Sequence, residues 1–578
     1  MRTSSLSLLT LLVACSGSRP GTAPVPAGHQ IVWPDEGPRT WAPRPTEAPI
    51  TANDLRTRLY QFADDSMLGR ESGTLGNFKG TEYVAREFTR LGLQPAGENG
   101  GYFQELPLGP TGYDIAASRL AAGGVEFRPG TDWIPASPSA RNGLAAKFSG
   151  ENLATVFGGR WGDTATVLDP AMIRDKAVIF LPAPTAASTR GPTAVRDLRA
   201  QGAGAAAVLV ASLDGVNPAL VNNAFTGRIA MRPAMLPGAA ATTGGAIISL
   251  AAAARIFGTP ADQLTLGAAG QPLSGAWSYE WRMSKYAGRN VIAILPGSDP
   301  LLRGSYVLIG AHNDHIGLNA AAPDHDSLRA FNRVMRPQGA NDVGGTPNAL
   351  QQHQIDSMIA RARSIRPIRR DSVNNGADDD GSGTAVLLEI AERFATEAPP
   401  RRSMIFISHV GEEKGLLGSR WFVDHPTVPL DSIVAAHNMD MLGKGRVTDV
   451  RFGGPNSVQM LGSRRLSSQF GDLVDSVNAV RSEAMVIDYS WDRTNALNRF
   501  CRSDQVSYFA KNIPVTYFSL GYAVDYHQPT DEPQYIDYDH GARVGRFVHD
   551  IATAIANRPT RLAVLPPEQR DMSARCGQ

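Results

Sequence analysis

The chain has 578 residues, of which 56 are Lys or Arg and 55 are Asp or Glu, so its formal net charge is +1. Such an even balance gives no support for a nucleic-acid partner, which normally needs a basic surplus or a basic stripe. No apolar run reaches the roughly 20 residues that a membrane-spanning helix needs. This argues against an integral membrane protein and leaves an anchored one open.

The N-terminal residues have the features of an export signal. An apolar stretch at residues 6–14 is the size of a signal-peptide core and is too short to span a membrane. It runs into Leu-Val-Ala-Cys, which resembles the bacterial lipobox and implies a lipid on Cys15 after cleavage. Residues 16–50 hold eight prolines, so we expect an extended tether between lipid and folded chain. We therefore predict an exported bacterial lipoprotein in the periplasm, at the outer membrane or on the cell surface.

The rest of the chain divides into regions that differ in composition and in the spacing of apolar residues. Apolar residues at helical spacing predict two helices within residues 51–93. Residues from about 125 to 275 are rich in Ala and Gly, poor in charge, and contain short strand-like runs. From about residue 276, short apolar runs alternate with helical patterns, which is typical of an α/β fold with a mostly parallel sheet between helices. The strands expected there are residues 291–295, 306–311, 403–408, 433–437 and 515–520.

Five polar segments follow these predicted strands or lie in the loops beside them. In open α/β sheets ligands bind at the carboxyl ends of the strands. Imidazole and carboxylate donors together suit zinc, and two His with three carboxylates can hold two ions when one carboxylate bridges them. The segments are Ala-His-Asn-Asp-His at 311–315, Asn-Gly-Ala-Asp-Asp-Asp-Gly-Ser-Gly at 375–383, Val-Gly-Glu-Glu-Lys-Gly at 410–415, Asn-Met-Asp-Met at 438–441 and Asp-Tyr-His-Gln-Pro-Thr-Asp at 525–531.

The order of these segments resembles the motifs of the co-catalytic di-zinc aminopeptidase family of clan MH, which also contains glutamate carboxypeptidase II and the transferrin-receptor ectodomain. The resemblance covers about residues 50–558 and implies the zinc exopeptidase fold and a peptide substrate. Gly-Ala-Gly-Ala-Ala-Ala-Val-Leu-Val at 202–210 resembles an inserted, β-rich protease-associated (PA) domain. The implied organisation is a signal peptide at 1–14, a lipidated Cys and tether at 15–50, the first part of the peptidase domain at 51–125, the PA-like domain at 126–275, the zinc peptidase domain at 276–558 and a C-terminal tail at 559–578.

The resemblance also implies two zinc ions per chain and assigns their ligands. Asp379 would bridge the two ions, and each ion would have two ligands of its own. The implied metal ligands are His312, Asp379, Glu413, Asp440 and His527. His312 and Asp440 would share one ion, and Glu413 and His527 the other.

Three further residues have implied roles. Glu412 matches the general base that takes a proton from the attacking water, and Tyr526 matches a tyrosine that helps to stabilise the tetrahedral intermediate. Asp314 matches a carboxylate that orients the ligating His312. His315 is either a substrate contact or a structural hydrogen-bonding residue, and Asp504 is a supporting residue near the pocket.

For two features the sequence leaves two alternatives each. Cys501 and Cys576 either pair in a disulfide that holds the tail or remain free thiols. The insertion between 318 and 373, with an Arg-rich helix within 351–370, is either a solvated surface element or a lid. His409 and His437 lie in apolar strands and are expected in the core.

The function that these features favour is an exported zinc exopeptidase that removes N-terminal residues from peptides. A carboxypeptidase or dipeptidase with an Arg pocket is the alternative within the family, and a glutaminyl cyclase would use one zinc. A non-catalytic, receptor-like binding protein would have lost ligands. We expect a membrane contact only through the lipid anchor.

Overall fold

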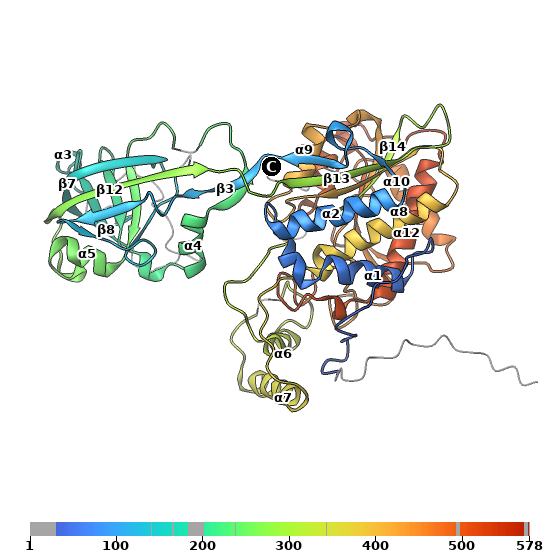
Figure 1. The fold of residues 1–578 in the computed structure, drawn as a ribbon, viewed down its shortest axis with the longest axis horizontal. Coiled ribbons are helices and arrows are strands. Elements are labelled where there is room, and N and C mark those ends of the chain that lie inside the picture. The colour runs from blue at the N-terminus through green and yellow to red at the C-terminus, as the bar shows by residue number, and fades with distance from the viewer. Residues whose placement is uncertain are drawn as a thin grey trace, which may run out of the picture.

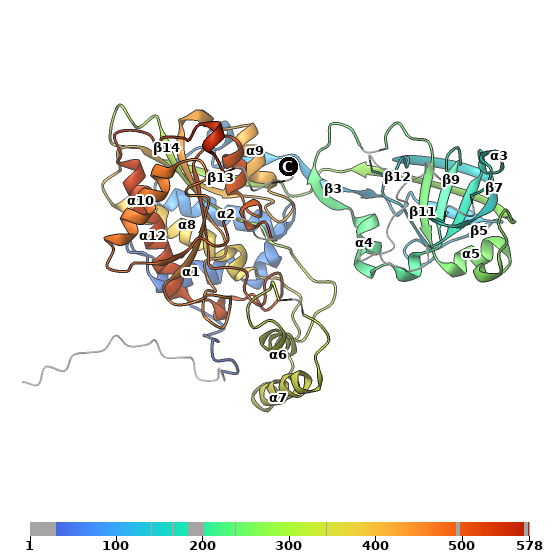
Figure 2. The same ribbon diagram turned by 180° about the vertical axis from the view of Figure 1, so that it is seen from behind.

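The described chain forms two lobes, each built on a sheet of its own (Figures 1 and 2). The structure is a computed structural model that describes residues 31–139, 142–163, 167–182, 201–236, 238–342, 344–492, 497–571 and 576. The predicted signal peptide, the lipidated Cys15 and the first half of the tether lie outside these residues. Within the described part of the chain, no helix is both long and apolar enough to cross a membrane.

The larger lobe contains a nine-stranded sheet whose four central strands are parallel, as predicted for the region after residue 276. These central strands are β15 (Ser403–His409), β14 (Tyr306–His312), β16 (Ile433–Met439) and β19 (Val515–Ser519). The outer strands β13, β1, β2 and β17 pair antiparallel to their neighbours, and β18 is parallel to β17. The outer strands are β1 (Gln94–Pro95), β2 (Phe103–Leu106), β13 (Gly288–Leu295), β17 (Ser457–Leu461) and β18 (Val486–Asp488).

Helices cover both faces of this sheet, so its central strands are buried and mostly apolar. In β14, Val307 and Ile309 pack into the core on one face and Leu308 into the core on the other, as the alternation of strand side chains requires. The helices on the first face are α1 (Ala52–Phe62), α2 (Leu75–Arg90), α8 (Gly383–Thr396), α10 (Ser468–Ala479) and α12 (Tyr538–Ala556). Those on the second face are α9 (Leu417–Asp424) and α11 (Gln505–Ala510).

The smaller lobe contains a ten-stranded sheet with its own apolar core. The sheet includes strands from residue 108 to residue 281, a wider range than the 126–275 predicted for the inserted domain. Its strands are β3 (Leu108–Tyr113), β4 (Arg119–Ala122), β5 (Val125–Glu126), β6 (Trp133–Pro135), β7 (Lys147–Arg160), β8 (Ala177–Leu181), β9 (Ala207–Val210), β10 (Arg228–Met231), β11 (Gly244–Ile248) and β12 (Ala269–Trp281). Its helices are α3 (Pro170–Ile173), α4 (Pro218–Thr226) and α5 (Leu250–Phe257). The assignment to the PA family stays a prediction.

The insertion between the first and second polar segments folds as a pair of helices that project from the larger lobe (Figure 1). They are α6 (His325–Met335) and α7 (Ala349–Ile365), which pack against each other. Arg329 of α6 forms an ion pair with Asp525 at 3.4 Å, and Arg369 pairs with Glu532. The insertion therefore contacts the loop that carries His527.

The second half of the predicted tether, residues 31–50, packs against the folded chain instead of extending from it. Trp33 is buried, and its indole Nε1 donates a hydrogen bond to Asp326 of α6 at 2.9 Å. Asp35 pairs with Arg329 at 2.7 Å. The prolines alone gave no sign of these contacts, because burial depends on a partner surface that lies some 300 residues away in the sequence.

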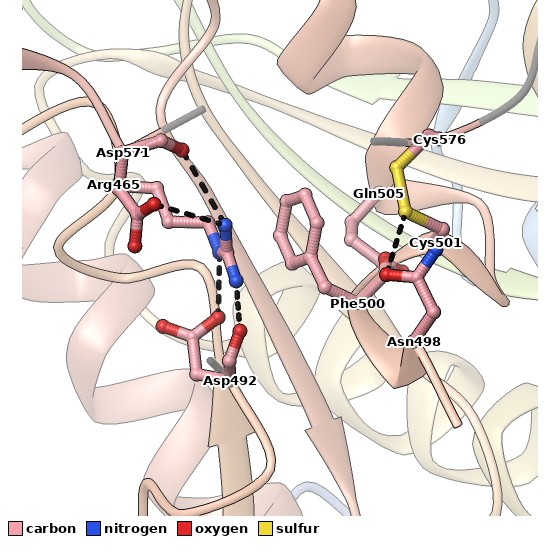
Figure 3. The surroundings of a disulfide bond; sticks show 8 residues. All are labelled: Arg465, Asp492, Asn498, Phe500, Cys501, Gln505, Asp571 and Cys576. Atoms are coloured by element: carbon pink, nitrogen blue, oxygen red, sulfur yellow. Dashed lines mark hydrogen bonds and ion pairs between the residues drawn. A yellow bond between two sulfur atoms is a disulfide. The ribbon is translucent and has the colours of Figure 1, made fainter. Parts of the chain in front are cut away.

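The C-terminal tail is held to the larger lobe by a disulfide between Cys501 and Cys576, whose Cα atoms are 5.3 Å apart (Figure 3). This pairing decides between the two alternatives that the sequence left open. Nearby, the buried Arg465 donates to Asp492 at 2.7 Å, and its backbone carbonyl accepts from the Asp571 N–H at 3.2 Å. The tail thus docks through both covalent and polar contacts.

Oxidised protein should yield a linked pair of peptides containing Cys501 and Cys576 in non-reducing peptide mapping. Reduction should separate the pair and, because the bond closes a 75-residue separation, lower the free energy of unfolding by up to about 4 kcal/mol. Alkylation of both thiols without a reductant would contradict the pairing.

Candidate functional site

The candidate site lies at the carboxyl edge of the four central strands, where their loops converge. His312 is the last residue of β14, and Asp440 follows β16 directly. Glu413 lies in the loop after β15, and His527 in the loop after β19. Parallel strands end at one edge of a sheet, so residues far apart in the sequence meet there.

One group of donors surrounds His312. Its Nε2 atom lies 3.2 Å from Asp379 Oδ1 and 3.7 Å from Asp440 Oδ1. All three side chains are buried, and their donor atoms lie within 4.8 Å of one another. The sequence predicted these three residues as one zinc site, and the fold brings them together.

A second group of donors shares Asp379. His527 Nε2 lies 3.1 Å from Asp379 Oδ2 and 3.0 Å from Glu413 Oε2. The two oxygens of Asp379 therefore face different imidazoles, which is the arrangement that a bridging carboxylate requires. Burial alone would raise the pKa of Asp379, but hydrogen bonding to His312 and His527 holds it well below its usual value.

Three donor atoms in these two groups have no hydrogen-bond partner outside the groups among the described residues. His312 Nε2, Asp440 Oδ1 and His527 Nε2 are buried, and the polar atoms that they face belong to the donor groups themselves. Buried polar atoms are rarely left in this state, and an ion is one of the standard explanations. Two imidazoles and three carboxylates in these positions fit a pair of zinc ions.

The other two aspartates of the triplet hold loops rather than face the donors. Asp380 accepts from the backbone N–H groups of His312 and Gly383, at 3.1 and 2.8 Å. Asp378 accepts from the Gly443 N–H at 2.6 Å. Asp379 is thus the one member of the triplet that lies within both donor groups.

The sequence analysis missed a buried cluster of charged residues, Lys444, Asp525 and Asp531, which holds the backbone at Asp379. The Asp531 carboxylate accepts the backbone N–H groups of Asp378 at 3.0 Å and Asp379 at 3.2 Å. Lys444 Nζ lies 2.6 Å from Asp531 and 2.9 Å from Asp525. These carboxylates raise the pKa of Lys444 although burial acts to lower it. The only sign of this cluster in the sequence was a lysine four residues after Asp440, and its neighbours in the sequence did not indicate that it is buried.

Of the three residues with predicted roles beside the metal ligands, Glu412 and Tyr526 are half-buried and Asp314 is fully buried. Glu412 is partly exposed, its backbone N–H donates to Asp314 Oδ1 at 3.1 Å, and burial is the main cause that raises its pKa. Tyr526 stacks on His527 with ring centroids 3.8 Å apart. His312 Nδ1 lies 3.1 Å from the backbone carbonyl of Asp314 and 3.6 Å from its carboxylate, so the closer contact is with the main chain.

The remaining histidines divide between core and site. His409 and His437 are buried in β15 and β16, as predicted, and burial lowers the pKa of each to about 3. Asp504 lies 3.5 Å from His409 Nδ1, and burial raises its pKa to about 7. His315, by contrast, lies beside the second donor group.

A cavity of about 700 Å³ adjoins this edge of the sheet and has walls from both lobes. Glu71 and Ile316 line it from the larger lobe, and Arg282 and Lys285 from the segment that joins the lobes. Glu71 also pairs with Lys414, the residue after Glu413, at 2.8 Å. The cavity therefore lies close to the donor groups.

The region that contains most of these residues is similar in sequence to a known family of peptidases. Residues 355–552 match the model of Peptidase family M28. Over these residues the chain is similar to M28 peptidases. The match supports the predicted enzyme class, a zinc metallopeptidase.

Curated relatives carry names consistent with this match. A probable zinc metalloprotease of Pyrenophora teres f. teres is 25% identical over 218 residues, which is 34% of this chain and 44% of that protein. Aminopeptidase YwaD of Bacillus subtilis is 44% identical over 69 residues, 12% of this chain and 15% of that protein. The chain thus spans less than half the length of these relatives. Among solved structures, the zinc aminopeptidase BSAP from Bacillus subtilis aligns with 92% of this chain and 98% of its own, at 16% identity and a TM-score of 0.45.

Replacing Lys444 by Met should destabilise the protein strongly. The change leaves the Asp531 carboxylate buried without its cation and leaves Asp525 with only Arg329, at 3.4 Å, and breaking a buried pair in this way costs about 3–5 kcal/mol. Lys511→Met is the matched control, because Lys511 pairs with Asp424 at 2.8 Å on the surface and exposed pairs contribute about 0–1 kcal/mol. Denaturant unfolding of both variants measures the difference, and equal losses would show that the Lys444 cluster is not structural.

Proposed function

We propose that this protein is an exported, zinc-dependent exopeptidase, and specifically an aminopeptidase that removes N-terminal residues from peptides. The observation that carries the proposal is the placement of Asp379 between two donor groups, each containing one histidine and one further carboxylate. The similarity to M28 peptidases and to proteins named aminopeptidases supports the same reaction.

The proposed ligands are those predicted from the sequence. His312, Asp379 and Asp440 would hold one zinc ion, and Asp379, Glu413 and His527 the other. Such a pair of ions polarises a scissile carbonyl and lowers the pKa of a water molecule. A receptor-like protein would be expected to lack ligands, whereas all five predicted residues are present and lie together.

Three residues of the chain itself would complete the reaction. Glu412 accepts the proton of the attacking water and returns it to the leaving amine. Glu412 directly precedes the proposed ligand Glu413 and is half-buried, which supports this role. The Tyr526 hydroxyl donates to the developing oxyanion, and stacking on His527 fixes the plane of its ring. The backbone carbonyl of Asp314 orients the imidazole of His312.

One observation favours a second candidate, a carboxypeptidase or dipeptidase. Arg502 is exposed beside the site, with its guanidinium 4.6 Å from the centre of the Tyr522 ring, and it interacts with Tyr526. A guanidinium in this position can bind a carboxylate in a bidentate manner. The free C-terminus or an acidic side chain of a substrate would supply that group.

Assays on matched substrates separate the two candidates. We expect purified, zinc-loaded protein to hydrolyse aminoacyl p-nitroanilides and to leave their N-acetyl derivatives intact, because an aminopeptidase recognises a free amine. Cleavage of N-acetyl dipeptides with a free carboxylate, without cleavage of the anilides, would establish the second candidate. Activity that survives removal of zinc by a chelator would contradict both.

The Glu412→Gln variant should keep its metal and lose activity. The amide preserves the shape of the side chain and cannot accept a proton, and general-base catalysis contributes about 10²–10⁴-fold to the rate. Metal analysis and kcat should be measured together, with Glu151→Gln, an exposed residue of the smaller lobe, as the control. A Glu412→Gln enzyme that keeps more than about a tenth of kcat would exclude Glu412 as the base.

Export and lipidation are proposed from the N-terminal sequence. Cys15→Ser should prevent lipidation and move the protein from the membrane fraction to the soluble fraction. Peptidase activity should be unchanged, because Cys15 precedes the segment that packs on the larger lobe. Fractionation and palmitate labelling test this, and wild-type protein that takes up no label would contradict the lipid anchor.

A further inference from the structure

His315, for which no ligand role was predicted, lies against the second donor group. Its Nδ1 atom is 2.8 Å from Glu413 Oε1 and 3.9 Å from Asp379 Oδ2. The side chain is fully buried. One donor atom each from His315, Asp379, Glu413 and His527 can be chosen so that all four lie within 4.8 Å of one another.

The surrounding backbone fixes the ring in this orientation. The N–H of His315 donates to the carbonyl of Arg70 at 3.1 Å. Gly376 lies against the ring so closely that a Cβ there would be 2.5 Å from the ring's Cγ. Arg70 in turn donates to the carbonyls of Asn375 and Gly376 at 2.6 and 2.8 Å. A ring held by backbone contacts on several sides is preorganised for one partner.

The two donor groups therefore differ in size. The first contains His312, Asp379 and Asp440, and the second has an additional imidazole. We propose that His315 is a fourth protein ligand of the second zinc ion, so that this ion has four protein donors and the first has three. The proposal rests on the di-zinc function proposed above.

This difference predicts unequal behaviour of the two ions. Zinc sites closed by four protein ligands are typical of structural positions, whereas catalytic positions keep an open place for water or substrate. The second ion should therefore be the more firmly held, and the first should exchange more readily and offer more room to a substrate.

The rival explanation is that His315 only donates a hydrogen bond to Glu413. The His315→Asn variant separates the two roles, because the Asn amide can donate near the position of Nδ1 but supplies no imidazole ligand. His353→Asn, on the exposed surface of α7, is the control. The measurements are zinc stoichiometry during titration with a chelator, and the visible absorption of the cobalt-substituted proteins.

If His315 is a ligand, His315→Asn should weaken one of the two sites by more than about 100-fold, since losing a group that only orients a ligand costs about 10–100-fold. The cobalt spectrum should change, and the other site should remain. A smaller loss of affinity with an unchanged spectrum would overturn the proposal. Wild-type protein that binds no zinc would instead overturn the proposed function itself, and this inference with it.

If the His315→Asn variant does not fold, the wild-type protein can still show whether His315 binds zinc. X-ray absorption of the zinc-loaded protein should show three imidazoles shared by two zinc ions, from His312, His315 and His527. Two imidazoles shared by the two ions would overturn the assignment of His315.

Discussion

The site depends on the position of one buried carboxylate. Asp379 lies between His312 and His527, with one oxygen 3.2 Å from the first and the other 3.1 Å from the second. A carboxylate that faces two imidazoles can link two ions, and displacement of this residue would disrupt both donor groups at once. The backbone around it is fixed by Asp531, which accepts the N–H groups of Asp378 and Asp379.

The charged residues that hold Asp379 in place are linked to segments outside the nine-stranded sheet. Lys444 joins Asp531 to Asp525, and Asp525 pairs with Arg329 of the helical insertion. Arg329 also pairs with Asp35 of the N-terminal segment. A chain of buried and half-buried charges thus runs from residues near the predicted anchor to the loop that bridges the donor groups. This connection gives the insertion a structural role.

The sequence predicted the elements that depend on local pattern. The short apolar runs located the four central strands, and the polar segments after them located the donor residues, because parallel strands end at a common edge. Three features could not be found in this way. The packing of Trp33, the burial of Lys444 and the approach of His315 to Glu413 all depend on contacts between distant segments. A lysine or histidine at such a position has the same local sequence whether it is exposed or buried.

The most direct test is an anomalous difference map recorded at the zinc absorption edge from crystals of the zinc-loaded protein. We expect two peaks, one on each side of the Asp379 carboxylate. One peak should lie against His312 and Asp440, and the other against Glu413 and His527. A single peak, or two peaks of which neither contacts Asp379, would contradict the claim that this carboxylate bridges two ions.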